Sequence, residues 1–366
     1  MVRKATGRSA AELGDWSVTA VHAGAGEGLG VYRFNGVGFD GPAALRWSLV
    51  LKVLGPQADG RTRSDWNFWR READAYRSGV LDELPGDLAA PRCLAVTDQP
   101  DGSVRLWLEE VREDLGERWP LPRYGVAARH LGHFNGAYVA DRLRPAGPWM
   151  ARRWLPALVA ANGPAVEQLL ALRDHPLVRL VLPSSEMQRL LRLWAEREPL
   201  LTALERLPRT FCHRDAFRRN LIARRTPGGG DQTIAIDWAF AGDGAIGEDV
   251  VPLITASVEF FEVEFADAQE LEAMVLDSYT QGLRDAGWHG DPAHVRYAFA
   301  AGSALRYGLG TVRLVLPQLL DARTHRRLEE LLGRPVGQVL EDWRVFYRYL
   351  LDQADYARAM QRSIGL

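Results

Sequence analysis

The stretch Phe211–Gly242 contains the arrangement of residues that most restricts how this chain can fold. Two short apolar segments flank the three consecutive glycines Gly228–Gly230, and this pattern predicts a β-hairpin. Asp215 and Asn220 precede the first predicted strand, and Asp237 follows the second. Because a hairpin brings the outer ends of its two strands together, we expect two carboxylates and one amide to converge there.

Oxygen ligands of this kind suit Mg²⁺, which proteins usually hold with one or two carboxylates together with phosphate oxygens of a substrate. A remaining carboxylate within hydrogen-bond reach can accept the proton of an attacking hydroxyl. The residues therefore indicate phosphoryl transfer. The alternative is a turn-rich hairpin whose Asp and Asn side chains only cap turns, which is their commoner role. A phosphate-binding lysine upstream would favour the first interpretation.

His213, Asp215 and Asn220 have the spacing H-x-D-x-x-x-x-N, and Asp237 ends a later strand within the sequence Ile-Asp-Trp. This arrangement resembles the catalytic and metal-binding segments of the protein-kinase-like superfamily, and within it the aminoglycoside phosphotransferase and choline kinase branch. Arg214 departs from that branch, which commonly has glycine at this place, whereas protein kinases have arginine. The resemblance spans about residues 16–320.

The resemblance implies an α+β fold with two lobes. We expect an N-lobe at 1–111 with a small antiparallel sheet, and a larger, mainly helical C-lobe at 112–366 that carries the catalytic loop, the metal site and the acceptor-binding helices. A chain of 366 residues is longer than a single core usually serves, which agrees with two lobes.

Composition excludes several other classes of protein. The formal net charge is −2, so no overall basic field favours nucleic acid or an anionic membrane. No apolar run approaches the length of a membrane span, and the N-terminus lacks the apolar core of a signal peptide. Cys93 and Cys212 lie far apart without metal-ligand spacing, so no disulfide framework is expected. These features predict a cytoplasmic protein.

The lysine that phosphoryl transfer requires lies in the predicted strand Leu45–Leu54. Lys52 stands there among bulky apolar residues, where a cation is costly unless it meets an anion. Upstream, glycines at every second position include Gly26 and Gly28, which predicts a hairpin whose backbone can approach a ligand closely. The resemblance implies that this hairpin covers the nucleotide phosphates and that Lys52 binds them. Asn35–Pro42 is expected to be a turn.

The segment Asp65–Gly79 predicts a helix, because its aromatic residues and alanines recur at spacings of three and four. Glu72 shares their face, so its carboxylate can point inward. The resemblance implies that Glu72 pairs with Lys52 and orients it on the nucleotide. The alternative is a surface glutamate near Arg70 or Arg71, as is common on helices.

Three further segments are assigned roles by their place in the chain. Pro91–Asp98 and Ser103–Val111 are predicted strands, and the resemblance implies that backbone groups of Glu109 and Val111 bind the nucleotide base. Asp249 could cap a helix and support the catalytic loop. The Arg- and Trp-rich segment 149–154 suits a planar or anionic acceptor, although helix packing and solvated charge are the commoner reason for such residues.

The predicted activity is an ATP- or GTP-dependent transfer of phosphate to a hydroxyl of a small molecule, such as an antibiotic, a sugar, an amino alcohol or another metabolite. In it, Asp215 accepts the hydroxyl proton, while Asn220 and Asp237 hold Mg²⁺. Two alternatives are a kinase for Ser or Thr in a peptide, and a pseudokinase-like nucleotide-binding module without activity. The sequence predicts neither the acceptor's identity nor the oligomeric state.

Overall fold

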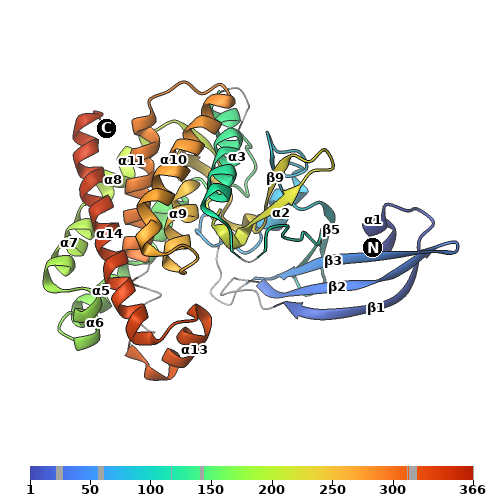
Figure 1. Cartoon of the computed structure of the whole chain (residues 1–366), viewed down its shortest axis with the longest axis horizontal. Coiled ribbons are helices and arrows are strands. Elements are labelled where there is room, and N and C mark those ends of the chain that lie inside the picture. Colours follow the sequence, from blue (N-terminus) through green and yellow to red (C-terminus); the bar gives the residue numbers. More distant parts are fainter. Residues whose placement is uncertain are drawn as a thin grey trace. The chain divides into compact units, whose positions relative to one another are not determined.

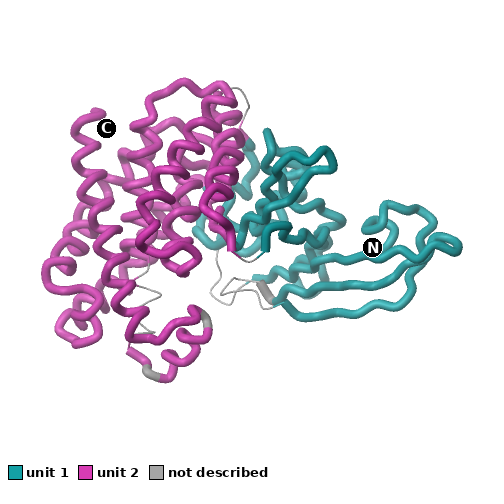
Figure 2. Tube along the Cα trace, in the orientation of Figure 1, with its two compact units in different colours: residues 1–117, 145–151, 219–241 teal, residues 118–144, 152–218, 242–366 magenta. Residues whose placement is uncertain are grey.

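The structure is a computed structural model, and it describes residues 1–21, 28–56, 62–116, 118–140, 144–310, 312 and 320–365. The chain divides into two compact units, which Figure 2 shows in different colours. Unit 1 consists of Met1–Glu117, Pro145–Ala151 and Arg219–Ala241, and unit 2 consists of Arg118–Arg144, Arg152–Arg218 and Gly242–Leu366. Two segments from beyond residue 112 therefore belong to the same unit as the N-terminal residues.

Unit 1 is built on a five-stranded antiparallel sheet in the order β1-β2-β3-β6-β5. Its strands are β1 (Glu12–Val21), β2 (Gly28–Asp40), β3 (Ala43–Leu54), β5 (Cys93–Asp98) and β6 (Val104–Glu109). Strand β3 is central, and Lys52 pairs with Val31 on one side and Leu106 on the other. Because β3 is paired with a strand on each side, the sheet fixes the position of the Lys52 backbone.

The expected turn at Asn35–Pro42 is wrong, because β2 continues to Asp40. Val37 and Phe39 alternate with glycines and extend the ladder as far as Ala44 on β3. The turn is limited to residues 41 and 42, where Gly41 has φ 60°. The period-two alternation of Val37 and Phe39 outweighed the glycines that suggested a turn.

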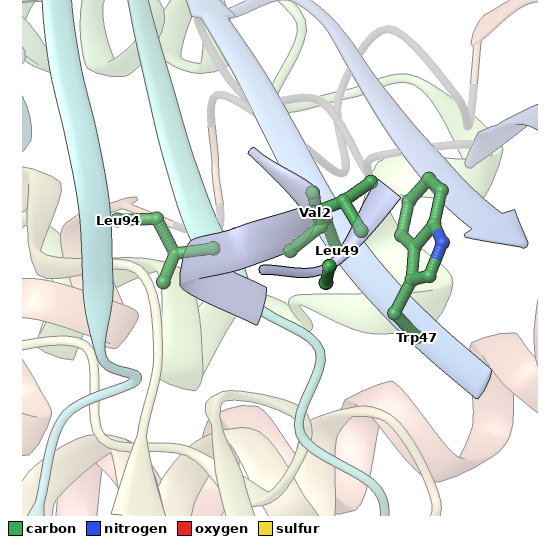
Figure 3. Close-up of a cluster of buried hydrophobic side chains, with 5 residues drawn as sticks. Val2, Trp47, Leu49 and Leu94 are labelled. Atoms are coloured by element: carbon green, nitrogen blue, oxygen red, sulfur yellow. The ribbon is translucent and has the colours of Figure 1, made fainter. Parts of the chain in front are cut away.

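The first residues of the chain cover part of this sheet. Helix α1 (Val2–Thr6) brings Val2 against Trp47 and Leu49 of β3 and Leu94 of β5, and Ala11 completes the cluster (Figure 3). All five side chains are buried. Burial of such residues from water is what holds α1 on the sheet.

The predicted helix at Asp65–Gly79 is shorter than expected. Helix α2 spans only Arg71–Arg77, and the preceding residues form turns. The reason is Arg71, whose guanidinium is fully buried. It donates to the backbone carbonyls of four residues of unit 1: Asp65 at 2.8 Å, Trp66 at 2.9 Å, Trp149 at 3.1 Å and Ala239 at 2.8 Å.

We predict that Arg71→Met lowers the free energy of unfolding by about 3–5 kcal/mol, because several buried carbonyls lose a charged donor together. Urea unfolding would measure the loss. Arg70→Met is the matched control, since Arg70 is partly exposed and pairs with Asp74 at 3.0 Å and Asp98 at 2.8 Å. The control should lose less than about 1 kcal/mol. Equal losses in the two variants would contradict this role of Arg71.

The predicted glycine-turn hairpin is confirmed. Strands β8 (Leu221–Arg225) and β9 (Asp231–Ala235) are antiparallel, with Leu221 opposite Ala235, and β4 (Leu88–Ala89) adds a third strand parallel to β9. Asn220 directly precedes β8, and Asp237 lies two residues beyond β9. Both therefore belong to the same end of the hairpin, opposite its glycine turn.

Unit 2 is mainly helical. Its helices are α3 (Leu121–Ala140), α4 (Trp154–Ala161), α5 (Gly163–Ala171), α6 (Pro176–Val181), α7 (Ser184–Ala195), α8 (Arg197–Arg206), α9 (Val250–Glu259), α10 (Ala268–Asp285), α11 (Pro292–Ser303), α13 (Ala322–Leu332) and α14 (Val336–Ser363). Helices α3 and α10 lie side by side (Figure 1). A Cβ atom at Gly132 would lie 2.1 Å from the carbonyl oxygen of Tyr279, so glycine is what permits this close approach.

A two-stranded antiparallel ribbon, β7 (Arg209–Cys212) with β10 (Gly242–Ala245), leads into the loop that carries Asp215. Both strands are largely buried. Within the described part of the chain, no helix combines the length and the apolar character that crossing a membrane requires.

Candidate active site

Three charged side chains from distant parts of the sequence meet in unit 1. Nζ of Lys52, on β3, lies 2.7 Å from Oε2 of Glu72 on α2 and 3.3 Å from Oδ1 of Asp237, just beyond β9. The Glu72 side chain is 1% exposed, whereas that of Asp237 is 41% exposed. The lysine thus has one buried partner that fixes it and one accessible partner.

The electrostatics of this cluster keep Lys52 charged. Burial by itself would lower the pKa of the Lys52 ammonium, but Asp237 and Glu72 together raise that pKa above its ordinary value. Burial raises the pKa of Glu72, and the charge of Lys52 offsets part of that increase. Oε1 of Glu72 also accepts a hydrogen bond from the backbone N–H of Trp238 at 3.4 Å, which ties helix α2 to the segment of Asp237.

Asp237 has a left-handed backbone conformation with φ 64°. This conformation costs a non-glycine residue about 1–2 kcal/mol, so surrounding contacts must hold it. The buried Trp238 ring provides one such contact, because its Nε1 donates to the carbonyl of Ala235 at 2.8 Å. The carboxylate is thereby fixed at the end of the hairpin while remaining open to solvent.

Asn220 is buried, and its backbone carbonyl accepts from the N–H of Ile236 at 2.9 Å. One amide and one carboxylate, from Asn220 and Asp237, therefore come from neighbouring strands. Among the described residues, no three or more His, Cys, Asp and Glu side chains cluster as a metal site would require. Mg²⁺ does not require such a cluster, since it retains water and phosphate ligands. The side-chain oxygens of Asn220 and Asp237 fit this way of binding Mg²⁺.

Asp215 belongs to unit 2, in the loop after β7. Its backbone N–H donates to Nδ1 of the buried His213 at 3.1 Å, and its carbonyl accepts from Phe217 at 2.9 Å. Its carboxylate Oδ1 lies 2.6 Å from Nη2 of Arg306, which comes from a segment 91 residues further along the chain. His213 thus supports the loop through its ring nitrogen.

A buried hydrogen-bond network holds the same loop from behind. Oδ2 of Asp249 accepts from the N–H of His213 at 3.0 Å and from Nδ2 of Asn135 at 2.9 Å, and Oδ1 accepts from the N–H of Arg214 at 2.6 Å. Oδ1 of Asn135 in turn accepts from the hydroxyl of Tyr279 at 2.7 Å. Burial raises the pKa of Asp249, while these hydrogen bonds favour its ionised form.

Asp249 was expected to cap a helix and to support the predicted catalytic loop; the structure shows it supporting the loop of Asp215 but not capping the helix. It occupies the N-cap position of α9, but its side chain makes no capping hydrogen bond there. The carboxylate oxygens accept from the loop of Asp215 and from α3 instead. Three hydrogen bonds to one buried, ionised carboxylate stabilise this arrangement more than a single capping hydrogen bond would.

The side chain of Arg214 is only 2% exposed. The backbone of Arg214 has a left-handed conformation with φ 68°. Nε lies 3.7 Å from a carboxylate oxygen of Glu248, Nη2 donates to the carbonyl of Asp243, and the guanidinium lies 5.7 Å from the Trp154 ring centroid. These contacts anchor the loop to β10 and to the start of α4. Arg214 therefore has a structural role in this arrangement.

The remaining predicted residues are placed as follows. Gly26 lies outside the described residues, and Gly28 begins β2 opposite Leu54. Glu109 ends β6, where its N–H donates to the carbonyl of Arg92 at 3.0 Å, and half-buried Val111 follows outside any regular element.

In the segment 149–154, Trp149 and Trp154 are buried, whereas Arg152 and Arg153 are exposed. The two tryptophans therefore contribute to packing, as the commoner interpretation of that segment has it.

Sequence reasoning missed several residues that support the site. Asn135 carries a weak signal, because a polar residue interrupts an otherwise small and apolar helix face. Tyr279 and Arg306 carry none, since the residues through which they support the site, Asn135 and Asp215, lie more than 90 residues away. Arg71 was considered only as a surface partner for Glu72, whereas its guanidinium is buried and bonds to backbone carbonyls.

The fold is similar to those of several solved kinases. An amicoumacin kinase determined with AMP-PNP, Ca²⁺ and Ami aligns over 92% of this chain and 88% of its own, with a TM-score of 0.56 and 14% identity. A choline kinase from Cryptosporidium parvum Iowa II aligns over 96% and 91%, with a TM-score of 0.53 and 11% identity. An aminoglycoside phosphotransferase from Alicyclobacillus acidocaldarius aligns over 92% of each chain, with a TM-score of 0.52 and 15% identity. These likenesses confirm the two-lobed α+β kinase-like fold.

The sequence profile of the phosphotransferase enzyme family matches residues 80–285, which is more than half of the chain, and the protein therefore belongs to that family. The expected resemblance is thus confirmed. The protein is a kinase that transfers phosphate to an alcohol group, and the family supports a small-molecule acceptor. No curated protein sequence matches the chain.

Proposed function

We propose that this phosphotransferase uses Mg²⁺-bound ATP or GTP and transfers the γ-phosphate to a hydroxyl of a small metabolite or antibiotic. The observation that carries the proposal is the contact of Lys52 with both Glu72 and Asp237. A partly buried lysine that is fixed by one carboxylate, next to a second and accessible carboxylate, suits a cation that is oriented on nucleotide phosphates beside a metal ligand.

On the nucleotide side, Asn220 and Asp237 would hold the metal ion, which when bound neutralises negative charge on the phosphates. Glu72 keeps the ammonium of Lys52 directed toward the phosphates. Gly26 and Gly28 are assigned to the hairpin that covers the phosphates, and backbone groups of Glu109 and Val111 to the base.

On the acceptor side, Asp215 orients the acceptor hydroxyl and receives its proton. The hydroxyl oxygen forms a bond to the γ-phosphorus, the bond from that phosphorus to the bridging oxygen breaks, and the nucleoside diphosphate leaves. Positioning and charge stabilisation supply most of the rate enhancement in such reactions. The Asp249 network contributes by keeping the backbone of the Asp215 loop in one conformation.

The acceptor is proposed to be a small molecule because the kinases with similar folds are named for amicoumacin, choline and aminoglycosides. Cys93 and Cys212 are unpaired, which suits the reducing and nucleotide-rich cytoplasm as the place of action.

Nucleotide binding is tested by thermal unfolding with Mg²⁺-ATP, Mg²⁺-GTP and each nucleotide with EDTA. At a nucleotide concentration of 100 times Kd, the folded state should gain about 2.7 kcal/mol. EDTA should remove most of the gain, and Asp237→Asn should lose it even with Mg²⁺ present. The absence of stabilisation by either nucleotide in the wild type would contradict the proposed function.

A further inference from the structure

Arg306 contacts the loop of Asp215 at two points. Nη2 lies 2.6 Å from Oδ1 of Asp215, and Nη1 donates to the backbone carbonyl of Arg214. One planar guanidinium therefore spans a side chain and the preceding peptide of the same loop. Because its donors have fixed directions, this contact sets the orientation of the carboxylate relative to the backbone.

The backbone around Arg306 departs from regular helix. Helix α11 ends at Ser303, and Ala304–Gly308 form a π-helical turn with Arg306 at its centre. Single π-helical turns are rare in proteins, and many of those that are found lie at functional sites. The turn directs the guanidinium toward the Asp215 loop, with the Trp154 ring centroid 4.8 Å away.

Arg306 remains a cation in this environment. Burial alone would lower the pKa of its guanidinium, but the carboxylates of Asp215 and Glu259 raise that pKa. Burial raises the pKa of Tyr307, so its hydroxyl stays neutral. The side chains of Arg306 and Asp215 are 13% and 20% exposed, so the ion pair is shielded from much of the solvent that weakens surface pairs.

We propose that Arg306 is a positioning residue for phosphoryl transfer, which holds the carboxylate of Asp215 in the orientation that accepts the acceptor's proton. The inference rests on the proposed role of Asp215. A carboxylate has two oxygens and about four acceptor positions, so an ion pair through Oδ1 is compatible with proton acceptance. A misplacement of about 1 Å in such a group can lower a rate about 100-fold, which gives positioning a measurable effect.

Two other roles would give a similar picture. The ion pair could stabilise the helical unit without affecting catalysis, or it could inhibit by competing with the acceptor for Asp215. The three roles predict different rates when Arg306 is replaced. Positioning predicts a slower enzyme, a purely structural role predicts an unchanged rate in the folded fraction, and inhibition predicts a faster enzyme.

The test measures release of inorganic phosphate from Mg²⁺-ATP with water as the acceptor, because this assay can be run without knowing the natural acceptor. The variants are Arg306→Ala and Arg306→Lys. Arg296→Ala is the matched control, since Arg296 lies on α11 and its partners Glu272 and Tyr356 lie outside the Asp215 loop. Thermal unfolding of each variant reports the folded fraction.

We expect Arg306→Ala to lower kcat about 10- to 100-fold with KM for ATP within about twofold, and Arg306→Lys to lower it less. Guanidinium ion at millimolar concentration should restore part of the rate of Arg306→Ala, and it should have no such effect on Arg296→Ala. The control should keep its kcat even if its unfolding temperature falls.

A kcat for Arg306→Ala equal to or above that of the wild type would overturn the inference. So would a loss that neither lysine nor guanidinium reduces. If wild-type protein neither hydrolyses nor binds Mg²⁺-ATP, the proposed function fails and the inference with it. If the wild type is active and Arg306→Ala is equally active, the inference about Arg306 is rejected and the proposed function is kept.

Discussion

Asp215→Asn is expected to lower kcat for phosphate transfer about 10²- to 10⁴-fold, the range that removal of a general base commonly produces. Asparagine keeps the size of the side chain, and its oxygen can still accept from Arg306, but it does not take up a proton. The Kd for Mg²⁺-ATP should stay within a few-fold of the wild type, because none of the residues assigned to the nucleotide changes. Phosphate release and calorimetric titration with Mg²⁺-ATP measure the two quantities separately.

Asp285→Asn serves as the control for this experiment. Asp285 is also a unit 2 carboxylate bonded to an arginine, with Oδ2 2.7 Å from Nε of Arg129. Its replacement should leave both kcat and Kd unchanged. If Asp215→Asn kept kcat within about threefold of the wild type, Asp215 would not be the proton acceptor.

The strand, helix and hairpin that carry Lys52, Glu72 and Asp237 could be predicted from local patterns, whereas the pairing of Glu72 with Lys52 was implied by the family resemblance. Lys52 lies in a strand that its apolar residues define, and Asp237 ends a hairpin that a glycine turn defines. The side chain of Glu72 was placed inward by helical spacing, and the structure has it buried. Local patterns of this kind survive into the fold because strand and helix periodicity decide which face is buried.

Contacts between distant residues could not be anticipated in the same way. The helix prediction over residues 65–79 failed because Arg71 bonds carbonyls as far away as Ala239. The direction of the Arg214 side chain is decided by Glu248 and by the carbonyl of Asp243, which no spacing in the sequence reveals. The arginine side chain is long, and its hydrogen-bond acceptors come from residues that are distant in sequence. Its role therefore cannot be inferred from its neighbours in sequence.

The Lys52–Glu72 pair allows activity and stability to be separated. Lys52→Met should abolish stabilisation by Mg²⁺-ATP and lower the free energy of unfolding by about 3 kcal/mol, because it leaves a buried carboxylate without its cation. Glu72→Leu should cost less, since Lys52 keeps Asp237 at 3.3 Å. The double variant Lys52→Met/Glu72→Leu should recover to within about 1 kcal/mol of the wild type, because two apolar side chains replace the pair. None of the three should transfer phosphate at the wild-type rate.

The stability loss of Lys52→Met should also depend on pH. Burial raises the pKa of Glu72 even beside Lys52, and without the lysine its ionised form is less favourable still. A carboxyl whose pKa is raised by folding stabilises the folded state at low pH, and that contribution disappears as pH rises through the raised pKa. The loss should therefore be larger at pH 8 than at pH 5, as measured by urea unfolding at both. A loss independent of pH, or a double variant no more stable than Lys52→Met, would show that Glu72 is not the group left uncompensated.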